Sequence, residues 1–259
     1  MKTLLLLEWM KVRKYKTFWA FIILFAISLA GINYFIHNVQ IQTKSLTHGM
    51  ADIQIFSFPQ IWSTTAWAGG FSVLLLGILI ITLVTNEYSF KTHRQQIIDG
   101  ISRKQFISGK WLTIIVFIIF AWISYFILTL IVGNHTENIS VFSGFDYAGY
   151  FLVKMAVSLS VAFMFALLFR RSGLAIALYL VYVFILEGIV KHFLDKIAGG
   201  LGMFLPLSAG GYLVSNPMRQ AIPGIETIHI QPVWILLTCL GYLILFVYLS
   251  YRYINHADL

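Results

Sequence analysis

Six long apolar stretches constrain this chain more than any motif it carries. Each approaches or reaches the roughly 20 residues that an α-helix needs to cross a bilayer. They predict spans at about 17–36, 66–85, 111–132, 148–169, 173–190 and 232–250. Hydrophobic residues make up 59% of the chain and charged residues 11%, with a mean hydropathy of +0.83, which excludes an ordinary soluble domain. We therefore predict an all-α membrane protein with six transmembrane helices, in a single domain over residues 1–259.

Basic residues mark one side of the predicted bundle. When the chain is threaded through six spans, 13 of its 18 Lys and Arg residues fall on one face, five of them in the polar loop 86–110. The positive-inside rule places that face in the cytoplasm, and an even number of spans puts both termini there. The net charge of +8 is thus explained by bases at span ends, where anionic headgroups attract them. We expect no nucleic acid as a partner.

Residues 1–16 precede the first predicted span and mix apolar side chains with bases. Trp and Tyr side chains in this region suit the headgroup layer, which predicts an interfacial helix leading into the membrane. A plain cytoplasmic extension of the first span is an equally compatible interpretation. A cleaved signal peptide competes with both, because Ser28, Leu29 and Ala30 offer the small residues of a cleavage site. We expect the segment to be retained.

The polar segment 86–110, NEYSFKTHRQQIIDGISRKQFISGK, lies between the second and third predicted spans. Asp99-Gly100 is a turn signal, and Gly100 suits the residue that follows a helix end. Ser102 and Gln105 have the spacing of a capping box, which predicts a helix that starts there and continues into the third span. We expect an apolar surface for a soluble partner around this break, made by Ile97, Ile98, Ile101, Phe106 and Ile107. An ordinary solvated connector is the alternative.

The same segment resembles the cytoplasmic loop of permease subunits in the type-2 ABC transporter family, especially small bacterial permeases with six spans. The opening EWMKVRKYKTFW and the later FLPLSAGGYL are also similar to that family. The resemblance implies that the loop forms a cytoplasmic coupling helix that docks on a separate ATPase. His93 stands where the family has a small or apolar residue. The coupling residues that the resemblance implies are Glu87, Thr92, Arg94, Asp99, Gly100, Ser102, Arg103 and Lys110.

A long external segment after the fifth span is a further implication of the resemblance, and residues 191–231 supply one. Pro206, Pro217 and Pro223 interrupt it, together with several glycines. Its apolar residues are too few for a span and too many for a solvated loop. We therefore expect re-entrant, lid-like external helices between spans five and six, since backbone breaks at membrane depth need protein to cover them.

Two ionisable residues fall within predicted spans, Lys154 in the fourth and Glu187 in the fifth. Counted along straight helices, the two reach a similar depth from opposite directions, so they are candidates for an intramembrane pair. Charges inside a membrane also mark substrate pathways. Pairing of Glu187 with Lys191, four residues on, is a third interpretation.

Motifs of enzymes and of nucleotide binding are absent from the sequence. It has no HExxH, no GxSxG and no paired-carboxylate motif, and its seven His residues are scattered over loops and both faces. It also has neither GxxxxGKS nor GxxxxGKT, so it cannot cradle ATP itself. We expect no catalytic residue, no metal and no cofactor in this chain, with ATP and Mg²⁺ bound by the partner ATPase. The single cysteine, Cys239, is expected to be a reduced core thiol.

Together with the six predicted spans, the resemblance implies the membrane-spanning permease subunit of an ATP-driven ABC exporter in the bacterial inner membrane. Its substrate would be hydrophobic or amphipathic, such as a peptide antibiotic, a lipid or a drug. The resemblance implies two ATPase subunits and a second permease, identical or homologous, as partners, with membrane lipid around them. A substrate-capture component of an importer and an intramembrane enzyme of unrecognised type are the alternatives.

Overall fold

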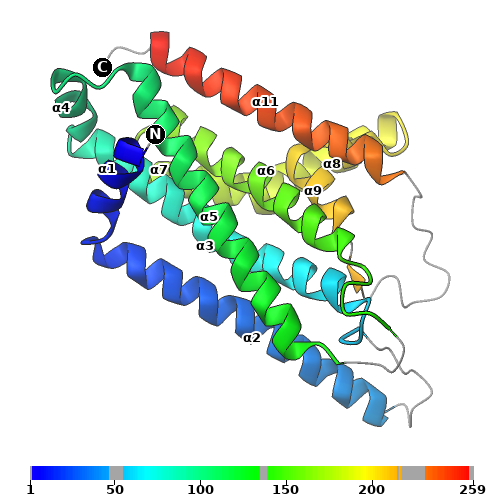
Figure 1. Ribbon diagram of the computed structural model, residues 1–259. Helices are drawn as coiled ribbons and strands as arrows, with labels where there is room; N and C mark the ends of the chain where they lie inside the picture. The colour runs from blue at the N-terminus through cyan, green and yellow to red at the C-terminus, as the bar shows by residue number, and fades with distance from the viewer. Residues whose placement is uncertain (1, 47–54, 135–138, 215, 218–230, 257–259) are drawn as a thin grey trace.

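The computed structural model describes residues 2–46, 55–134, 139–214, 216–217 and 231–256, which form a bundle of helices (Figure 1). Within these residues six helices are long and apolar enough to cross a membrane. They are α2 (Lys16–Leu46), α3 (Ile61–Ser89), α5 (Arg103–Val132), α6 (Asp146–Phe169), the continuous run of α7 (Ser172–Val181), η1 (Tyr182–Leu186) and α8 (Glu187–Ile197), and α11 (Pro232–His256). The prediction of an all-α fold with six spans is confirmed.

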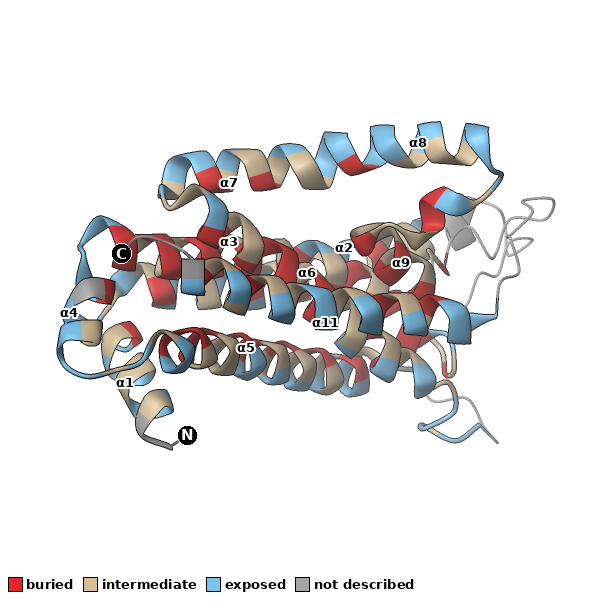
Figure 2. Cartoon of the chain, turned by 90° about the horizontal axis from the view of Figure 1, so that it is seen from above, coloured by how far each residue is buried: buried red, intermediate tan, exposed pale blue. Residues whose placement is uncertain are grey.

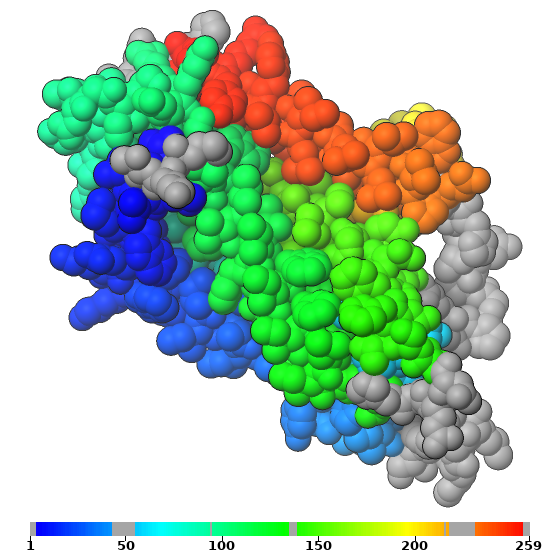
Figure 3. All heavy atoms as spheres, viewed as in Figure 1, coloured from blue at the N-terminus to red at the C-terminus, as the bar shows by residue number. Residues whose placement is uncertain are grey.

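Two short helices lie at the same end of the bundle as the last turn of α11 (Figure 1). One is α1 (Lys2–Val12), which a break at residues 13–15 separates from α2. The other is α4 (Thr92–Ile98), in the loop between the second and third spans. Figure 3 shows α1, in dark blue, seated against α5, in green, so the N-terminal segment packs on the bundle instead of extending away from it.

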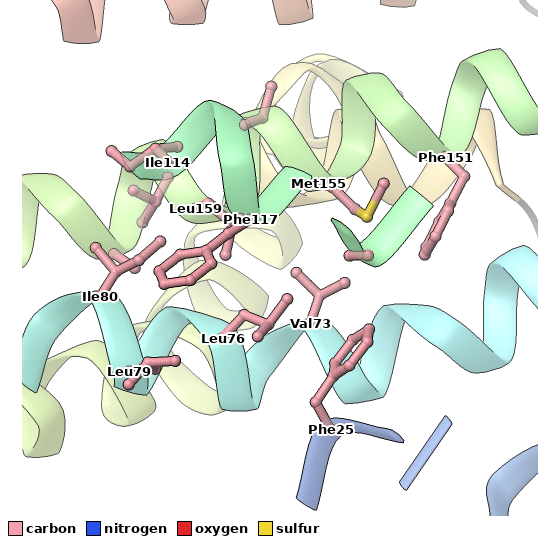
Figure 4. Close-up of a cluster of buried hydrophobic side chains, with 14 of the residues drawn as sticks. Phe25, Val73, Leu76, Leu79, Ile80, Ile114, Phe117, Phe151, Met155 and Leu159 are labelled. Carbon is pink, nitrogen blue, oxygen red and sulfur yellow. The ribbon is translucent and has the colours of Figure 1, made fainter. Parts of the chain in front are cut away.

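The core of the bundle is built on α3 and α6, which carry most of the buried residues (Figure 2). Phe151, Met155 and Leu159 of α6 face α3, and α5 adds Phe117 to the same cluster (Figure 4). Side chains one or two turns apart on each helix thus interlock with those of its neighbours. Lipid tails are as apolar as these residues, so close packing and dispersion hold the helices together more than removal from water does.

Hydrogen bonds between spans supplement this packing. Thr65 of α3 and Thr129 of α5 share a hydrogen bond of 2.7 Å, and Tyr125 of α5 donates to the carbonyl of Trp62 at 2.9 Å. All four side chains are fully buried. In a membrane the alternative for such groups is an unsatisfied dipole in hydrocarbon, so each bond contributes about 0.6 kcal/mol and fixes the register of α3 against α5.

The fifth span lies at the side of the bundle and is irregular in its middle. Figure 2 shows α7 and α8 running along one flank, with mostly exposed residues. Residues Tyr182–Leu186 between them form a π-helical turn, which places one extra residue in the turn and rotates α8 relative to α7. The helix also continues to Ile197, seven residues beyond the predicted end of the span at about 190.

Two short helices come after the fifth span, η2 (Leu201–Phe204) and α9 (Pro206–Leu213). Pro206 occupies the first turn of α9, where a missing N–H costs nothing. The buried face of α9 packs against α6 and α11. A pair of short helices in segment 191–231 agrees with the prediction, whereas its remainder at 215 and 218–230 lies outside the described residues.

Candidate functional site

The loop between α3 and α5 folds into a compact elbow, residues 90–102, around the short helix α4. Lys91 adopts a left-handed conformation (φ 55°) that turns the chain from α3 into α4. Gly100, with a φ of +95°, ends α4, a conformation that a residue with a Cβ adopts only at a cost. Ser102 Oγ accepts from Gln105 N at 3.2 Å, and Ser102 N donates to Gln105 Oε1 at 2.9 Å. The predicted break and capping box are confirmed.

Beneath the elbow lies an ion cluster, formed by the buried Glu87 and Lys110 and the partly buried Glu8 and Lys11. Lys110 Nζ is 2.5 Å from Glu87 Oε1 and 2.7 Å from Glu8 Oε2. Lys11 Nζ is 2.7 Å from Glu8 Oε1 and 2.9 Å from Glu87 Oε1. Two carboxylates and two ammonium groups therefore balance, and they join three elements: α1, the end of α3 and the start of α5.

The charges of the ion cluster compensate one another. Burial raises the pKa of Glu8, but the nearby ammonium groups of Lys110 and Lys11 outweigh this and hold the pKa below its ordinary value of 4.5. The stem of Lys110 also places its ammonium 5.2 Å from the ring centre of Phe106. Removing one member would leave an uncompensated charge in a buried site, a change that costs about 3–5 kcal/mol in comparable pairs.

Glu87 and Lys110 therefore point inward, although the sequence pattern groups them with coupling residues. Their relative exposures are 8% and 4%, and their charges bind each other and α1. A contribution to coupling remains a prediction for both, and this geometry lets them act only by holding α1, α3 and α5 together. Sequence reasoning missed Glu8, whose one signal is that it is the only acid among the first 51 residues.

Arg103 is turned toward the C-terminal end of α11. Its guanidinium donates to the carbonyl of Asn255 at 3.1 Å and to that of Ile254 at 3.4 Å. One turn and a half further on, Ser108 shares a hydrogen bond of 2.8 Å with the hydroxyl of Tyr251. Free carbonyls at the end of a helix attract a cation, so Arg103 fastens the start of α5 to the sixth span.

The remaining predicted coupling residues lie on α4 or the turns beside it. Thr92 is exposed, and its hydroxyl donates to the carbonyl of Glu87 at 3.4 Å. Asp99 is exposed and accepts from Gln95 Nε2 at 3.2 Å. Gly100 is exposed in its turn, and Arg94 lies in α4, with its side chain outside the described part of the structure.

His93, on the inner side of the elbow, and Arg170, behind it, are not among the predicted coupling residues. His93 is buried, and its Nδ1 lies 3.0 Å from the carbonyl oxygen of Glu87. The guanidinium of Arg170, just after α6, lies 5.4 Å from the ring centre of Tyr88 and 5.6 Å from that of Tyr253. The end of α3, next to the elbow, is thus held to the ends of α6 and α11 as well.

The outer side of the elbow is apolar and basic. Phe90 is 75% exposed and Ile98 is 79% exposed, and the exposed bases Lys91 and Lys104 lie nearby in the chain. Ile97 and Ile101 are half-buried. The expectation that Phe106 and Ile107 add to this surface is wrong, because both are buried under the elbow on the inner face of α5.

A cavity of ≈ 390 Å³ opens beside this surface, between α1, α3 and α4. Val12, Tyr15, Leu83 and Phe90 form the apolar part of its lining, and the other lining residues are polar or charged, among them Glu8, Lys11 and Glu87 of the ion cluster. The exposed apolar residues and the cavity together form a candidate docking surface at the end of the bundle where α1 and α4 lie.

The two intramembrane charges are not joined by an ion pair in the described residues. Glu187 Oε1 accepts from the backbone N–H of Ser208 at 2.5 Å, so this carboxylate caps the N-terminus of α9. Lys154 packs its stem against Gly210 of the same short helix, while its ammonium lies against Gly70 of α3. Lys191 also lacks the predicted contact with Glu187, and its ammonium lies 4.8 Å from the ring centre of Tyr212. The π-helical turn before Glu187 and the insertion of α9 explain why straight-helix counting failed.

Within the described residues no group of three or more His, Cys, Asp or Glu side chains is placed to hold a metal ion. Cys239 is buried with a free thiol. The candidate functional site is therefore a surface and the scaffold behind it, without a constellation of catalytic side chains.

Comparisons with known proteins agree with this geometry. A search of curated proteins found no match. A family model described as an ABC-2 family transporter protein matches residues 4–186, which is most of the chain and includes α1, the elbow and the first four spans. With six helices able to cross a membrane and a family match over more than half its length, this chain belongs to the ABC-2 transporter family of membrane permeases.

Proposed function

We propose that the chain is the permease subunit of an ATP-driven exporter in a bacterial inner membrane, working with two copies of a separate ATPase. A second permease, identical or homologous, completes the translocation path. The observation that carries this proposal is the elbow: an exposed apolar and basic surface attached directly to the second and third spans. The substrate class that we propose is hydrophobic or amphipathic.

Movement of the ATPase is transmitted to the membrane-spanning part of the chain through α5. This helix is capped by Ser102 inside the elbow and runs without a break from Arg103 to Val132, so a push on α4 tilts one rigid rod of 30 residues. The ion cluster ties the same rod to α1 and to the end of α3. These three elements therefore move together, and movement of the elbow is transmitted instead of being lost in a flexible connector.

The partner presents an apolar protrusion edged with acidic side chains. Phe90 and Ile98 offer the apolar contact, and the cavity between α1, α3 and α4 receives a side chain of the partner. Lys91 and Lys104 favour an acidic rim and increase the rate of association. Orientation is set by the same charges, since the positive-inside rule places this end in the cytoplasm, where ATP is available.

The outer gate is formed by the fifth span and α9. Its support is the looser packing of α7 and α8 at the flank of the bundle, together with the π-helical turn between them. Such turns mark functional positions in helices. We propose that transport runs outward, because the family that the chain resembles includes exporters.

Co-purification with the ATPase tests the proposal. The tagged chain is expressed with an ABC ATPase from the same genome that co-purifies with it, and the yield of complex is compared for Ile98→Asp and Ile197→Asp. The two isoleucines are 79% and 81% exposed, but they lie at opposite ends of the bundle. We expect Ile98→Asp alone to lower the yield at least about tenfold, because it places a charge in an apolar contact. Equal yields from both variants would exclude the elbow as the docking surface.

A further inference from the structure

Lys154 lies in a pocket inside the membrane-spanning part of the bundle, and its charge has no acid to balance it there. The pocket has a volume of ≈ 290 Å³ and is enclosed by α3, α6, the α7–η1 region and α9. In the described residues Lys154 forms neither an ion pair nor a hydrogen bond, and Glu187, the nearest predicted partner, caps α9 instead. An ammonium group left alone in hydrocarbon costs about 2.5–3.5 kcal/mol, so its position calls for a ligand.

The backbone around Lys154 makes room for its ammonium. A Cβ added at Gly70 would collide with the Nζ atom and come within 2.9 Å of Cε, while one added at Gly210 would lie 3.2 Å from Cγ. Gly70 is nine residues from the start of α3 and Lys154 eight from the start of α6, which puts both about 12–14 Å into the bundle. The side chain therefore crosses toward α3 at that depth instead of extending to the membrane surface.

Hydrogen-bond donors collect in this pocket, and no acidic side chain is among the described residues that line it. Besides Lys154, it is lined by Ser158, by Trp67 and by Tyr179. None of these four side chains donates a hydrogen bond within the part of the chain that the structure describes. An ammonium and an indole N–H can only donate, and each hydroxyl has a proton to give. A ligand that matches them carries several acceptor oxygens and a negative charge.

The rest of the lining is apolar and reaches the lipid-facing side. Phe71 is 49% exposed and Phe184 is 66% exposed, and both border the pocket. Trp67 packs edge-on against Phe71, with ring centres 5.3 Å apart. The hydrocarbon tail of a ligand therefore has room to pack against these aromatic side chains while its headgroup contacts Lys154.

We propose that this Lys154 pocket binds an anionic amphiphile, a molecule with one carboxylate or phosphate headgroup and a hydrocarbon tail. The headgroup accepts from Lys154, and the tail lies between Phe71 and Phe184, with Ser158, Trp67 and Tyr179 in the rest of the lining. Either a free acid or an anionic phospholipid supplies this chemistry. This binding needs the permease chain alone, so its presence or absence does not depend on whether the ATPase docks at the elbow.

Binding of radiolabelled palmitate to the purified chain in dodecyl maltoside tests the proposal. Hexadecanol and hexadecyltrimethylammonium, which share the tail but not the negative charge, serve as competitors. We expect unlabelled palmitate to compete and the other two to fail. Lys154→Met should weaken palmitate binding at least about tenfold, whereas Lys196→Met, which removes an exposed charge from α8, should leave it unchanged.

A second variant and the thermal stability of each protein separate binding from folding. Gly70→Ala fills the space of the ammonium and should also weaken binding. Lys154→Met should unfold at or above the temperature of the wild type, because the ammonium has no protein partner to lose and its burial is unfavourable. Native mass spectrometry after extraction from membranes identifies the occupant. Phosphatidylglycerol retained by the wild type but not by Lys154→Met indicates a lipid, and palmitate binding without it indicates a free acid. Palmitate binding that is unchanged in Lys154→Met, or hexadecanol that competes as well as palmitate, would overturn the proposal.

Discussion

Lys110 Nζ lies 2.5 Å from Glu87 Oε1, although 23 residues separate the two along the chain. The elbow lies between them, so this ion pair closes its base and holds the end of α3 beside the start of α5. Glu8, which lies on α1, binds the same ammonium through its Oε2 at 2.7 Å. The base of the elbow is therefore a junction of three helices. Because these three helices are joined at the base of the elbow, a displacement of α4 is transmitted to the membrane-spanning helices α3 and α5.

Lys110→Met should destabilise the folded protein by about 3 kcal/mol, because it leaves the carboxylates of Glu87 and Glu8 short of a cation in a buried site. The double variant Lys110→Met with Glu87→Gln should recover part of that loss. Unfolding in detergent, followed by circular dichroism, gives both values. Losses that simply add would show that the two side chains are not energetically coupled.

The ion cluster should also make stability depend on acidity. Glu8 has a lowered pKa, so its contribution is fully present above the ordinary value of 4.5 and is lost as the pH falls through the lower value of the folded protein. The wild type should therefore be more stable than Glu8→Gln at pH 7, and the difference should shrink in acid below pH 4.5. Melting temperatures of the two proteins between pH 7 and pH 3 measure this. A difference that grows in acid would contradict the assignment.

The capping box sets where α5 begins. Ser102→Ala removes the oxygen that accepts from Gln105 N and should cost about 1 kcal/mol, whereas Ser102→Asp keeps an acceptor at the same place and should cost much less. Hydrogen exchange of the amides in the first turn of α5 reports the change directly. Equal exchange in the two variants would mean that the helix start is fixed by its neighbours instead.

Arg103 should hold the last turn of α11. Arg103→Ala removes its hydrogen bonds to the carbonyls of Ile254 and Asn255, so amide exchange at the end of α11 should become faster. Lys104→Ala is the matched control, since Lys104 is the exposed neighbour of Arg103 on the same helix. Faster exchange in both variants would point to a general loosening of α5.

The effects of Lys154→Met and Glu187→Gln on stability should add. Glu187 caps α9 through Ser208, while Lys154 lies against Gly70 of another helix. Glu187→Gln should be the more damaging change, because the amide accepts more weakly from the N-terminus of α9. Thermal unfolding of the single and double variants measures these effects. A double variant that is more stable than the sum of the two single effects would indicate that Lys154 and Glu187 form an ion pair, as the sequence suggests.

Local signals in the sequence predicted much of this fold. Hydropathy located the six spans, because a lipid-facing helix must be apolar over its length. The turn at Gly100 and the cap at Ser102 were predictable because both depend on residues within one or two turns.

Contacts between distant segments were not predictable in the same way. Glu8 meets Lys110 across 102 residues, and nothing in the local pattern of either one indicates the other. The depth of Glu187 was counted along a straight helix, whereas a π-helical turn and the insertion of α9 decide where its carboxylate points. The inward turn of Glu87 and Lys110 likewise results from the packing of α1, which sequence resemblance alone does not convey.

Site-specific crosslinking tests the central claim, that the elbow binds the ATPase, most directly. Replacing the buried Cys239 by Ser gives a background free of cysteine, into which Ile98→Cys or Ile197→Cys is introduced and labelled with a benzophenone maleimide. After illumination of membranes that contain both proteins, we expect a covalent adduct with the ATPase from position 98 and none from position 197. An adduct from position 197 but not from position 98 would contradict the account.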